Sequence, residues 1–267
     1  MPAFDAKGHR ILDCETCGHR FLAIEDPGSH IERVYDDSYF TGGGAGYLNY
    51  LLEEQMLRDR GRMYAAKVAE YIDEPGIILD IGAAAGCILK GFEDSGWSCV
   101  GLEPNAGMVK AGTDRYALDL RVGSLEQYET DERFDLISMI QVAGHFYDPR
   151  KAFENAARFL RPDGHLLIET WNRESMMARV FGTRWHEYSP PSVVQWWSLD
   201  GLTAFLEQMG FGKIADGRPS KKISGEHARS LLEYRLGKTV LPKLILKWLN
   251  IPYPSEDLFW GLYRKRE

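Results

Sequence analysis

The chain has no stretch of about 18 consecutive apolar residues, so its sequence predicts no membrane-spanning helix. The opening MPAFDAKGHR has no apolar run behind a basic region, and we therefore expect no signal peptide. Four cysteines in 267 residues are too few for a disulfide framework, which favours a reducing, cytoplasmic location. The chain also lacks internal repeats and low-complexity tracts.

Basic residues are outnumbered, since 32 Lys and Arg stand against 39 Asp and Glu, for a net charge of −7. Such a field repels nucleic acid and anionic membrane surfaces, so we expect neither as a partner. Hydrophobic residues make up 44% and charged residues 27%, an ordinary globular composition. The length allows one large α/β domain with an appendage, or two small domains.

From about residue 77, short apolar runs alternate with helical segments. The runs predict strands at IILDI (77–81), SCVGLE (98–103), LDLRV (118–122), FDLISMI (134–140) and HLLIET (165–170). Strands that are apolar on both faces and separated by helices predict a parallel sheet with helices on both sides. The sequence therefore predicts a doubly wound, Rossmann-like α/β domain over about residues 50–222.

Helical periodicity predicts helices over 48–72 and 199–210, and a third helix that carries Phe153, Ala157 and Leu160 on one side. Pro162, Asp163 and Gly164 predict a turn before the strand at 165–170. Two further strands are expected in FGKIADGRPSKKI (211–223) and DLFWGLYRKR (257–266), with an apolar helical insertion at about 226–250 between them.

The segment ILDIGAAAG (78–86) ends a buried strand on Asp80 and continues into a turn of small residues. A dinucleotide would place its pyrophosphate beside that acid, and the Gly-x-Gly-x-x-Gly spacing is absent. S-adenosylmethionine (SAM) instead carries a sulfonium and an amino group, both positive. Glu103, at the end of the second strand, can accept hydrogen bonds from ribose hydroxyls. The alternative is a tight turn without a ligand.

With these motifs in order, the chain resembles the class I SAM-dependent methyltransferases over about residues 35–222. LDIGAAAG resembles their Asp-x-Gly-x-Gly-x-Gly, with Ala84 in place of the middle glycine, where a positive φ would be strained. GLEP, GSLE, FDLISMIQVAGHFYDP and LRPDGHLLIET are similar to the segments that follow. The resemblance implies a mostly parallel seven-stranded sheet of order 3-2-1-4-5-7-6 with one antiparallel strand.

The resemblance also implies SAM as cofactor and assigns residues to it. Glu103 would bind the ribose, Pro104 and the segment of Ser124 and Leu125 would lie at the adenine, and Gln141 at the methionine end. The complete set implied at the cofactor is Asp80, Gly82, Ala83, Ala84, Gly86, Glu103, Pro104, Ser124, Leu125 and Gln141. His145, in the loop after the fourth strand, is the candidate general base, with His186 as its competitor.

The N-terminal segment, residues 1–34, contains Cys14 and Cys17 in CETCGHRF, which is similar to one knuckle of a zinc ribbon. A closed zinc site needs four ligands, and only His9, His19 and His30 lie nearby as substitutes. We therefore interpret this segment as a zinc-ribbon-like remnant preceding a methyltransferase domain at 35–267. Bound zinc and reduced thiols are both left open, and no catalytic metal is expected.

Several aromatic residues have two interpretations. A group after the fifth strand either covers sheet edges or forms a substrate wall; its members are Trp171, Trp185, Tyr188, Trp196 and Trp197. Tyr39 and Tyr47 flank a Gly-rich stretch and either close over the cofactor or anchor a loop. For the 226–250 insertion three interpretations are open: it packs on the domain, covers the acceptor site or forms a homodimer contact. Membrane binding is less expected, because helices at a membrane surface usually carry more basic residues than the two lysines of its most apolar stretch.

The sequence thus predicts a SAM-dependent methyltransferase acting on a small-molecule acceptor such as a sugar, an aromatic compound or another metabolite. It does not identify the acceptor or the atom methylated. Two alternatives stay open. One is a methyltransferase for RNA or protein, for which a basic groove would be expected. The other is a SAM-binding protein without catalysis.

Overall fold

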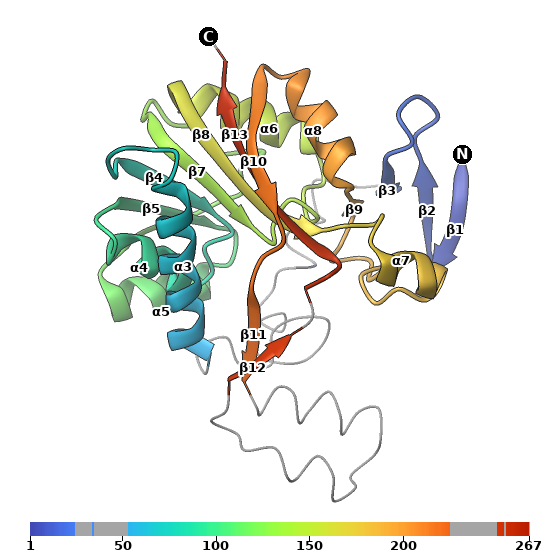
Figure 1. The fold of residues 1–267 in the computed structure, drawn as a ribbon, viewed down its shortest axis with the longest axis horizontal. Helices are drawn as coiled ribbons and strands as arrows, with labels where there is room; N and C mark the ends of the chain where they lie inside the picture. The colour runs from blue at the N-terminus through green and yellow to red at the C-terminus, as the bar shows by residue number, and fades with distance from the viewer. Residues whose placement is uncertain (25–33, 35–52, 225–249, 254, 267) are drawn as a thin grey trace, which may run out of the picture.

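A computed structural model describes residues 1–24, 34, 53–224, 250–253 and 255–266. Its centre is a seven-stranded sheet (Figure 1). From one edge to the other the strands are β10 (Phe211–Gly217), β13 (Leu258–Lys265), β8 (Leu160–Trp171), β7 (Phe134–Ile140), β4 (Ile77–Ile81), β5 (Ser98–Glu103) and β6 (Asp119–Val122).

The pairing of these strands confirms the predicted topology. Strands β6, β5, β4, β7 and β8 are parallel, whereas β13 lies antiparallel between β8 and β10. Counted in chain order within this sheet, the arrangement is 3-2-1-4-5-7-6. Because parallel strands end at one edge, the turns after β4, β5, β6, β7 and β8 gather there, which is where α/β folds bind ligands.

Helices cover both faces of the sheet (Figure 1). One buried cluster includes side chains of α3 (Glu54–Val68) and α4 (Cys87–Glu93), with α5 (Ala106–Tyr116) packed against it. The cluster on the opposite face is formed with α6 (Pro149–Phe159) and α8 (Leu199–Glu207). The helices cover the two faces of the sheet, and the loops converge at the edge formed by the carboxyl ends of the parallel strands.

Helix starts follow local sequence signals. The side chains of Asn105, Asp148 and Ser198 accept hydrogen bonds from backbone N–H groups in the first turns of α5, α6 and α8. The predicted helix over 48–72 ends earlier, at Val68, and its predicted start lies outside the described residues. The predicted helix to 210 likewise ends at Glu207.

One prediction about β8 was wrong. Residues 162–164 were expected to form a turn before a strand at 165–170, but the strand runs from Leu160. Its pairing with β7 shifts between Leu160 and His165, and Asp163 has a φ of 62°. The turn residues therefore form an irregularity within the strand, and Leu160, predicted on the preceding helix, is its first residue.

The N-terminal residues form a second, antiparallel sheet with a strand from much later in the chain. Its order is β1 (Pro2–Ala6), β2 (His9–Asp13), β3 (Arg20–Leu22) and β9 (Gln195–Trp196). Its sheet therefore extends beyond the predicted 1–34 segment. The short helices α7 (Met176–Phe181) and η2 (Gly182–Arg184) lie beside it (Figure 1).

A third sheet has two strands, β11 (Lys221–Ser224) and β12 (Asn250–Tyr253). They flank the predicted insertion, nearly all of which lies outside the described residues. Within the described ranges, no helix is long and apolar enough to cross a membrane.

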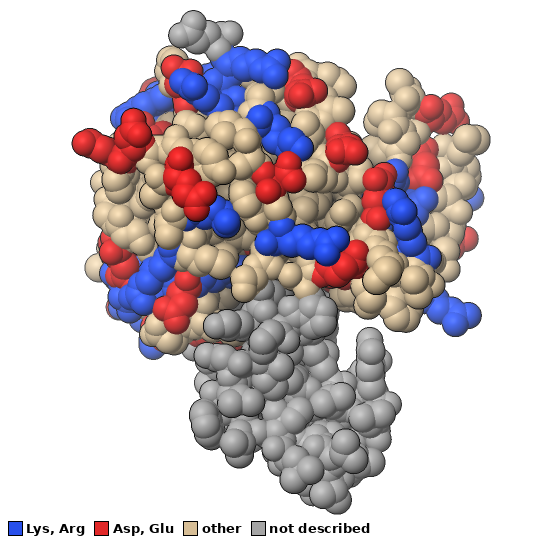
Figure 2. Space-filling view, in the orientation of Figure 1, with Lys and Arg blue, Asp and Glu red and all other residues tan. Residues whose placement is uncertain are grey.

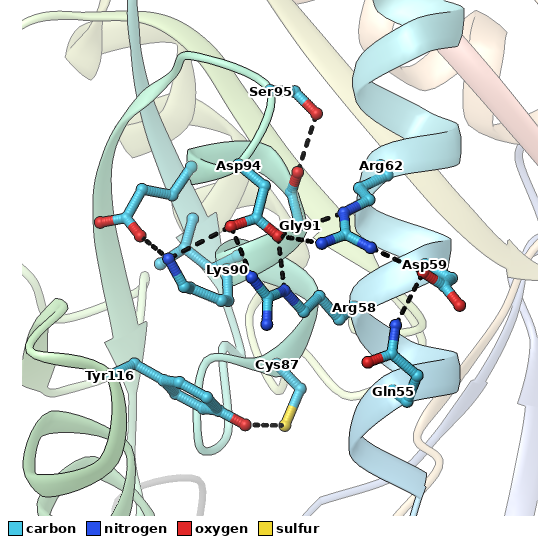
Figure 3. Close-up of polar contacts among 12 residues, drawn as sticks. Gln55, Arg58, Asp59, Arg62, Cys87, Lys90, Gly91, Asp94, Ser95 and Tyr116 are labelled. Atoms are coloured by element: carbon cyan, nitrogen blue, oxygen red, sulfur yellow. Dashed lines mark hydrogen bonds and ion pairs between the residues drawn. The ribbon is translucent and has the colours of Figure 1, made fainter.

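Helices α3 and α4 approach each other closely through two glycines. A Cβ built on Gly91 would lie 2.2 Å from the Arg58 carbonyl oxygen, and one on Gly61 would lie 2.0 Å from that of Ile88. Around this contact, Arg58 and Arg62 of α3 both pair with Asp94 at the end of α4 (Figure 3). The glycines thus permit close packing of the two helices, and the ion pairs with Asp94 flank that contact. Together they hold α3 against α4, the helix that begins at the Gly-rich turn.

We expect Gly91→Ala to destabilise the protein by about 1–3 kcal/mol, because the added methyl group must push the two backbones apart. Urea unfolding measures the effect. The matched control is Gly107→Ala in the exposed first turn of α5, where alanine should be neutral or stabilising. Equal stability of the Gly91→Ala variant and the wild type would show that the close contact adapts without cost.

Candidate functional site

The turn between β4 and α4 has a backbone that favours small residues. Gly82, Ala84 and Gly86 have φ values of 68°, 49° and 77°. A Cβ on Gly82 would also lie 2.5 Å from Val142 Cγ2. Alanine at φ 49° is strained, as the sequence had suggested for the residue in place of the middle glycine. Strain held in a turn at the carboxyl edge is a feature of functional sites.

Asp80 lies next to last in β4 and is buried. The Ser138 hydroxyl, from the adjacent strand β7, donates a hydrogen bond of 2.6 Å to its Oδ1. Burial raises the pKa of Asp80 to about 7; the hydrogen bond from Ser138 lowers it, and the Glu103 charge raises it further. Near neutral pH this carboxyl is therefore poised between its two protonation states.

Glu103, the last residue of β5, is buried next to the same turn. Its two carboxylate oxygens accept hydrogen bonds of 2.9 Å from the backbone N–H groups of Ala84 and Asn105. Burial raises the pKa of Glu103, while these two N–H groups act in the opposite direction. Glu103 thus ties the strained turn to the start of α5, with Pro104 in between, and each oxygen retains a lone pair for a further donor.

Neither Asp80 nor Glu103 forms an ion pair with any residue in the described part of the chain. Two buried carboxyl groups lie at neighbouring strand ends, and the charge of Glu103 raises the pKa of Asp80. Such a pair favours a ligand that brings positive charge. They disfavour a phosphate at the same turn. A sulfonium or ammonium group with neutral hydroxyls fits this set of acceptors.

After β6, the segment predicted to contact the cofactor divides into two parts. Ser124 is partly exposed, whereas the Leu125 side chain is fully buried in the cluster beneath the sheet. The side chain of Leu125 is thus not available to a ligand, and only its backbone remains a candidate.

Glu126 is an acidic residue at this edge that the sequence analysis missed. It is buried, and its Oε1 accepts a hydrogen bond of 3.2 Å from the backbone N–H of Tyr147. Burial raises its pKa to about 7. Glu126 is the last residue of the GSLE motif, and no role was assigned to it because its burial depends on the distant loop after β7.

Gln141 follows the end of β7 and has a φ of 61°, a left-handed conformation that is uncommon for a side chain of this size. Its backbone N–H donates a hydrogen bond of 2.7 Å to the carbonyl of Glu169 in β8. This bond holds the chain at the point where it leaves the sheet. The strained conformation marks the methionine-end candidate as a second strained position at the carboxyl edge.

Glu169 itself belongs to a buried network that sequence reasoning missed. Its side chain is fully buried and accepts hydrogen bonds from Arg60 and Tyr64, both on α3. Burial raises the pKa of Tyr64 well above its ordinary value, and the negative charge of Glu169 raises it further. A buried carboxylate requires such partners. The network attaches α3 to the strand that supports Gln141.

His145 lies in the loop after β7, and its ring is held by backbone carbonyls. Its Nδ1 lies 2.7 Å from the carbonyl oxygen of Ser192, which can only accept, so Nδ1 carries the proton. Burial lowers the pKa of His145, while the carbonyls of Ser192 and Gln141 raise it. The neutral ring therefore prevails near neutral pH.

The competing histidine and the aromatic group lie differently. His186 is about half exposed, with Nε2 at 3.0 Å from a Glu187 carboxylate oxygen, and its ring contacts Trp171. Of the predicted aromatic wall, only Trp171 is partly exposed. The remaining four are buried in the cores, namely Trp185, Tyr188, Trp196 and Trp197. The substrate-wall interpretation therefore loses these four side chains.

Cys14 and Cys17 are both free thiols in a turn between β2 and β3. Backbone N–H groups of Cys17 and Thr16 lower the pKa of Cys14. Across the described residues, no group of three or more His, Cys, Asp or Glu side chains could hold a metal ion. Tyr39, Tyr47 and His30 lie outside those residues.

Comparison with known proteins agrees with this geometry. The sequence profile of a family described as "Methyltransferase domain" matches residues 54–215. A ubiquinone biosynthesis O-methyltransferase of Bradyrhizobium diazoefficiens is 25% identical over 152 residues, which cover 50% of this chain. The chain spans only 60% of the length of that relative.

Two solved structures share the fold. One is the 1,6-didemethyltoxoflavin-N1-methyltransferase of Burkholderia thailandensis with bound 1,6-didemethyltoxoflavin and S-adenosylhomocysteine (SAH). It has a TM-score of 0.57 and 14% identity over 100% of this chain and 99% of its own. The other is the N-methyltransferase NodS of Bradyrhizobium japonicum with SAH, with a TM-score of 0.55 and 15% identity over 91% and 100% of the two chains.

The raised pKa of Asp80 predicts a pH-dependent stability. The pKa is about 7 in the folded protein against an ordinary value of 3.8, so the folded state retains a proton that the unfolded state releases. Stability from this group is present below pH ~4 and is lost as the pH rises towards 7, by up to ~1.4 kcal/mol per unit of pKa shift.

An Asp80→Asn variant has no such titration. Its free energy of unfolding, relative to the wild type, should therefore increase between pH 5 and pH 8, as measured by urea unfolding at both values. The control is Asp131→Asn at an exposed position, which should show no such change. An Asp80→Asn difference that is the same at both pH values would contradict the raised pKa.

Proposed function

The chain belongs to the class I SAM-dependent methyltransferase family, and on that premise we propose that it transfers a methyl group from SAM to a small-molecule acceptor. The observation that carries the proposal is the pair of buried carboxyl groups, Asp80 and Glu103, beside a strained turn of small residues. SAM supplies an electrophilic methyl group on a sulfonium, and its positive charge suits this acidic edge.

Each residue at the edge has a role in this proposal. Asp80 faces the positively charged methionine end, and Glu103 accepts hydrogen bonds from the ribose hydroxyls with its remaining lone pairs. The turn from Gly82 to Gly86, with Ala83 and Ala84, lets the ligand approach the backbone. Pro104, Ser124 and the Leu125 backbone lie towards the adenine. Gln141 lies towards the methionine end.

A small-molecule acceptor is supported by the relatives and by the charge distribution. The proteins named above include an O-methyltransferase of ubiquinone biosynthesis and an N-methyltransferase with bound 1,6-didemethyltoxoflavin. Acidic and basic side chains are interspersed over the face shown in Figure 2. With a net charge of −7, this pattern favours a small acceptor over an RNA.

Catalysis would combine positioning with removal of a proton. Holding the nucleophilic atom in line with the methyl group supplies much of the rate. His145, neutral and with Nδ1–H donated to Ser192, can accept the acceptor's proton on Nε2. The protonated ring would then have two backbone carbonyls, those of Ser192 and Gln141, as acceptors.

We expect Glu103→Ala to weaken SAM binding by about 1.5–3 kcal/mol, the range for hydrogen bonds to a charged group. Isothermal titration calorimetry on the folded variant measures it. Glu103→Gln should lose less SAM affinity, because the amide oxygen can still accept a hydrogen bond from one of the two backbone N–H groups. The control is Glu129→Ala at an exposed position. Unchanged SAM affinity in Glu103→Ala would remove this residue from the ribose, and NADH binding at the site would refute the proposal.

We expect His145→Ala to bind SAM nearly normally and to lose roughly 10²–10⁴ in turnover, the contribution of a general base. Turnover is followed with labelled SAM and a panel of phenol, amine and sugar acceptors. His165→Ala, at a half-buried histidine in β8, is the matched control. Wild-type turnover in His145→Ala would leave positioning alone, or His186, as the source of the rate.

A further inference from the structure

The loop that leaves β7 is held by a segment that also belongs to the N-terminal sheet. We call residues 142–146 the exit loop and residues 192–197 the supporting segment. Backbone N–H groups of Val194 and Gln195 donate to the Gly144 carbonyl at 2.8 and 2.9 Å. The Gln195 side-chain amide donates to the Phe146 carbonyl at 3.1 Å. These bonds account for acceptors of the exit loop that no helix or sheet would otherwise satisfy.

Two rings complete the contact. The Trp197 indole N–H donates to the Ala143 carbonyl at 2.8 Å. The ring of His19 lies against Trp197, with centroids 4.1 Å apart, and its Nε2 lies 2.8 Å from Gln195 Oε1. His19 is therefore the N-terminal residue that touches both side chains bonded to the exit loop.

The hydrogen bonds between His19, Gln195 and Phe146 all run in one direction. Gln195 donates through Nε2 to a carbonyl, so its Oε1 is left as an acceptor. His19 must then donate from Nε2, which is consistent with a neutral ring, since burial lowers its pKa to about 4. Arg173 and Asp13 act on the ring with opposite signs. The chain of donors runs from His19 through Gln195 to Phe146.

The N-terminal sheet fixes the position of His19. Strand β3 pairs with β9 through Arg20 and Phe21, directly after His19. The turn before it is closed by a hydrogen bond of 2.8 Å from the Cys14 backbone N–H to the His19 carbonyl. The backbone hydrogen bond of the Cys-x-x-Cys turn and the pairing of β3 with β9 therefore place His19 against the supporting segment.

We propose that His19 is a positioning residue, through which the N-terminal sheet fixes the exit loop and thus Gln141 and His145 at the methyl-transfer site. The inference rests on the proposed function, since it concerns the same site. It gives the segment that resembles half of a zinc ribbon a mechanical role at the site.

The test compares two replacements of His19. His19→Phe keeps a ring against Trp197 and removes the donor, whereas His19→Gln keeps a donor for Gln195 and removes the ring. Hydrogen–deuterium exchange of a peptide covering residues 141–147 and calorimetric titration with SAH are the measurements. His19→Phe should exchange faster there and bind SAH about 2- to 10-fold more weakly, as for one lost hydrogen bond. His19→Gln should recover most of both.

Gln195→Met is the second route to the same result, because it removes the side-chain amide and leaves the backbone bonds to Gly144. Its effects should resemble those of His19→Phe, and the double variant should be no worse than either single one. His9→Phe, the same change in β2 of the N-terminal sheet, is the control and should behave like the wild type.

The proposal is overturned if His19→Phe and Gln195→Met keep wild-type exchange in residues 141–147, or if His9→Phe loosens that peptide equally. It is also overturned if exchange rises throughout the chain in both variants. A wild-type protein that binds no SAH would refute the proposed function instead, and the exchange measurement would still decide on His19.

Discussion

Buried negative charge at the carboxyl edge of the sheet is the constraint on which the site depends. Asp80 and Glu103 lie in adjacent strands, and each is almost entirely removed from water. Removing a carboxylate from water is costly unless hydrogen bonds or positive charge compensate. In this protein Ser138 and two backbone N–H groups compensate in part. A cationic ligand can offset the rest of the cost of burying these carboxylates. The same two side chains would therefore determine how tightly a ligand binds and whether a cationic ligand is preferred over an anionic one.

Three contacts fix the elements around those charges. The α3–α4 contact fixes the helix that begins at Gly86, and the network of Glu169 with α3 fixes the strand beside Gln141. The supporting segment does the same for the exit loop. Rigid scaffold elements around a few strained backbone positions are what a preorganised site requires, because strain persists only where neighbours enforce it.

The sequence predicted the parts that depend on local pattern. The strands, the Gly-rich turn and the places of Asp80 and Glu103 at strand ends follow from apolar runs and turn residues. The strand order was implied by the resemblance to the methyltransferase family and not by these patterns. The Glu169 network and the contact of His19 with Gln195 could not be predicted, because their partners are distant in the chain and carry no periodic signal. The aromatic group could not be placed from sequence either, since a tryptophan such as Trp185 or Trp196 can line a substrate pocket or fill a hydrophobic core equally well. The turn predicted at Asp163 was wrong because residues typical of turns also occur at irregularities within strands.

The order in which the strands enter the two main sheets has a consequence for biosynthesis. Strands β1 to β3 cannot complete their sheet until Gln195 and Trp196 of β9 have been synthesised. Strand β13 follows both β8 and β10 in the chain and inserts between them, so each of those strands has an open edge until β13 is made. Contacts of such sequence separation form slowly, and unpaired edges invite association between chains. Until β13 has been synthesised and has paired, a nascent chain therefore exposes strand edges that invite aggregation.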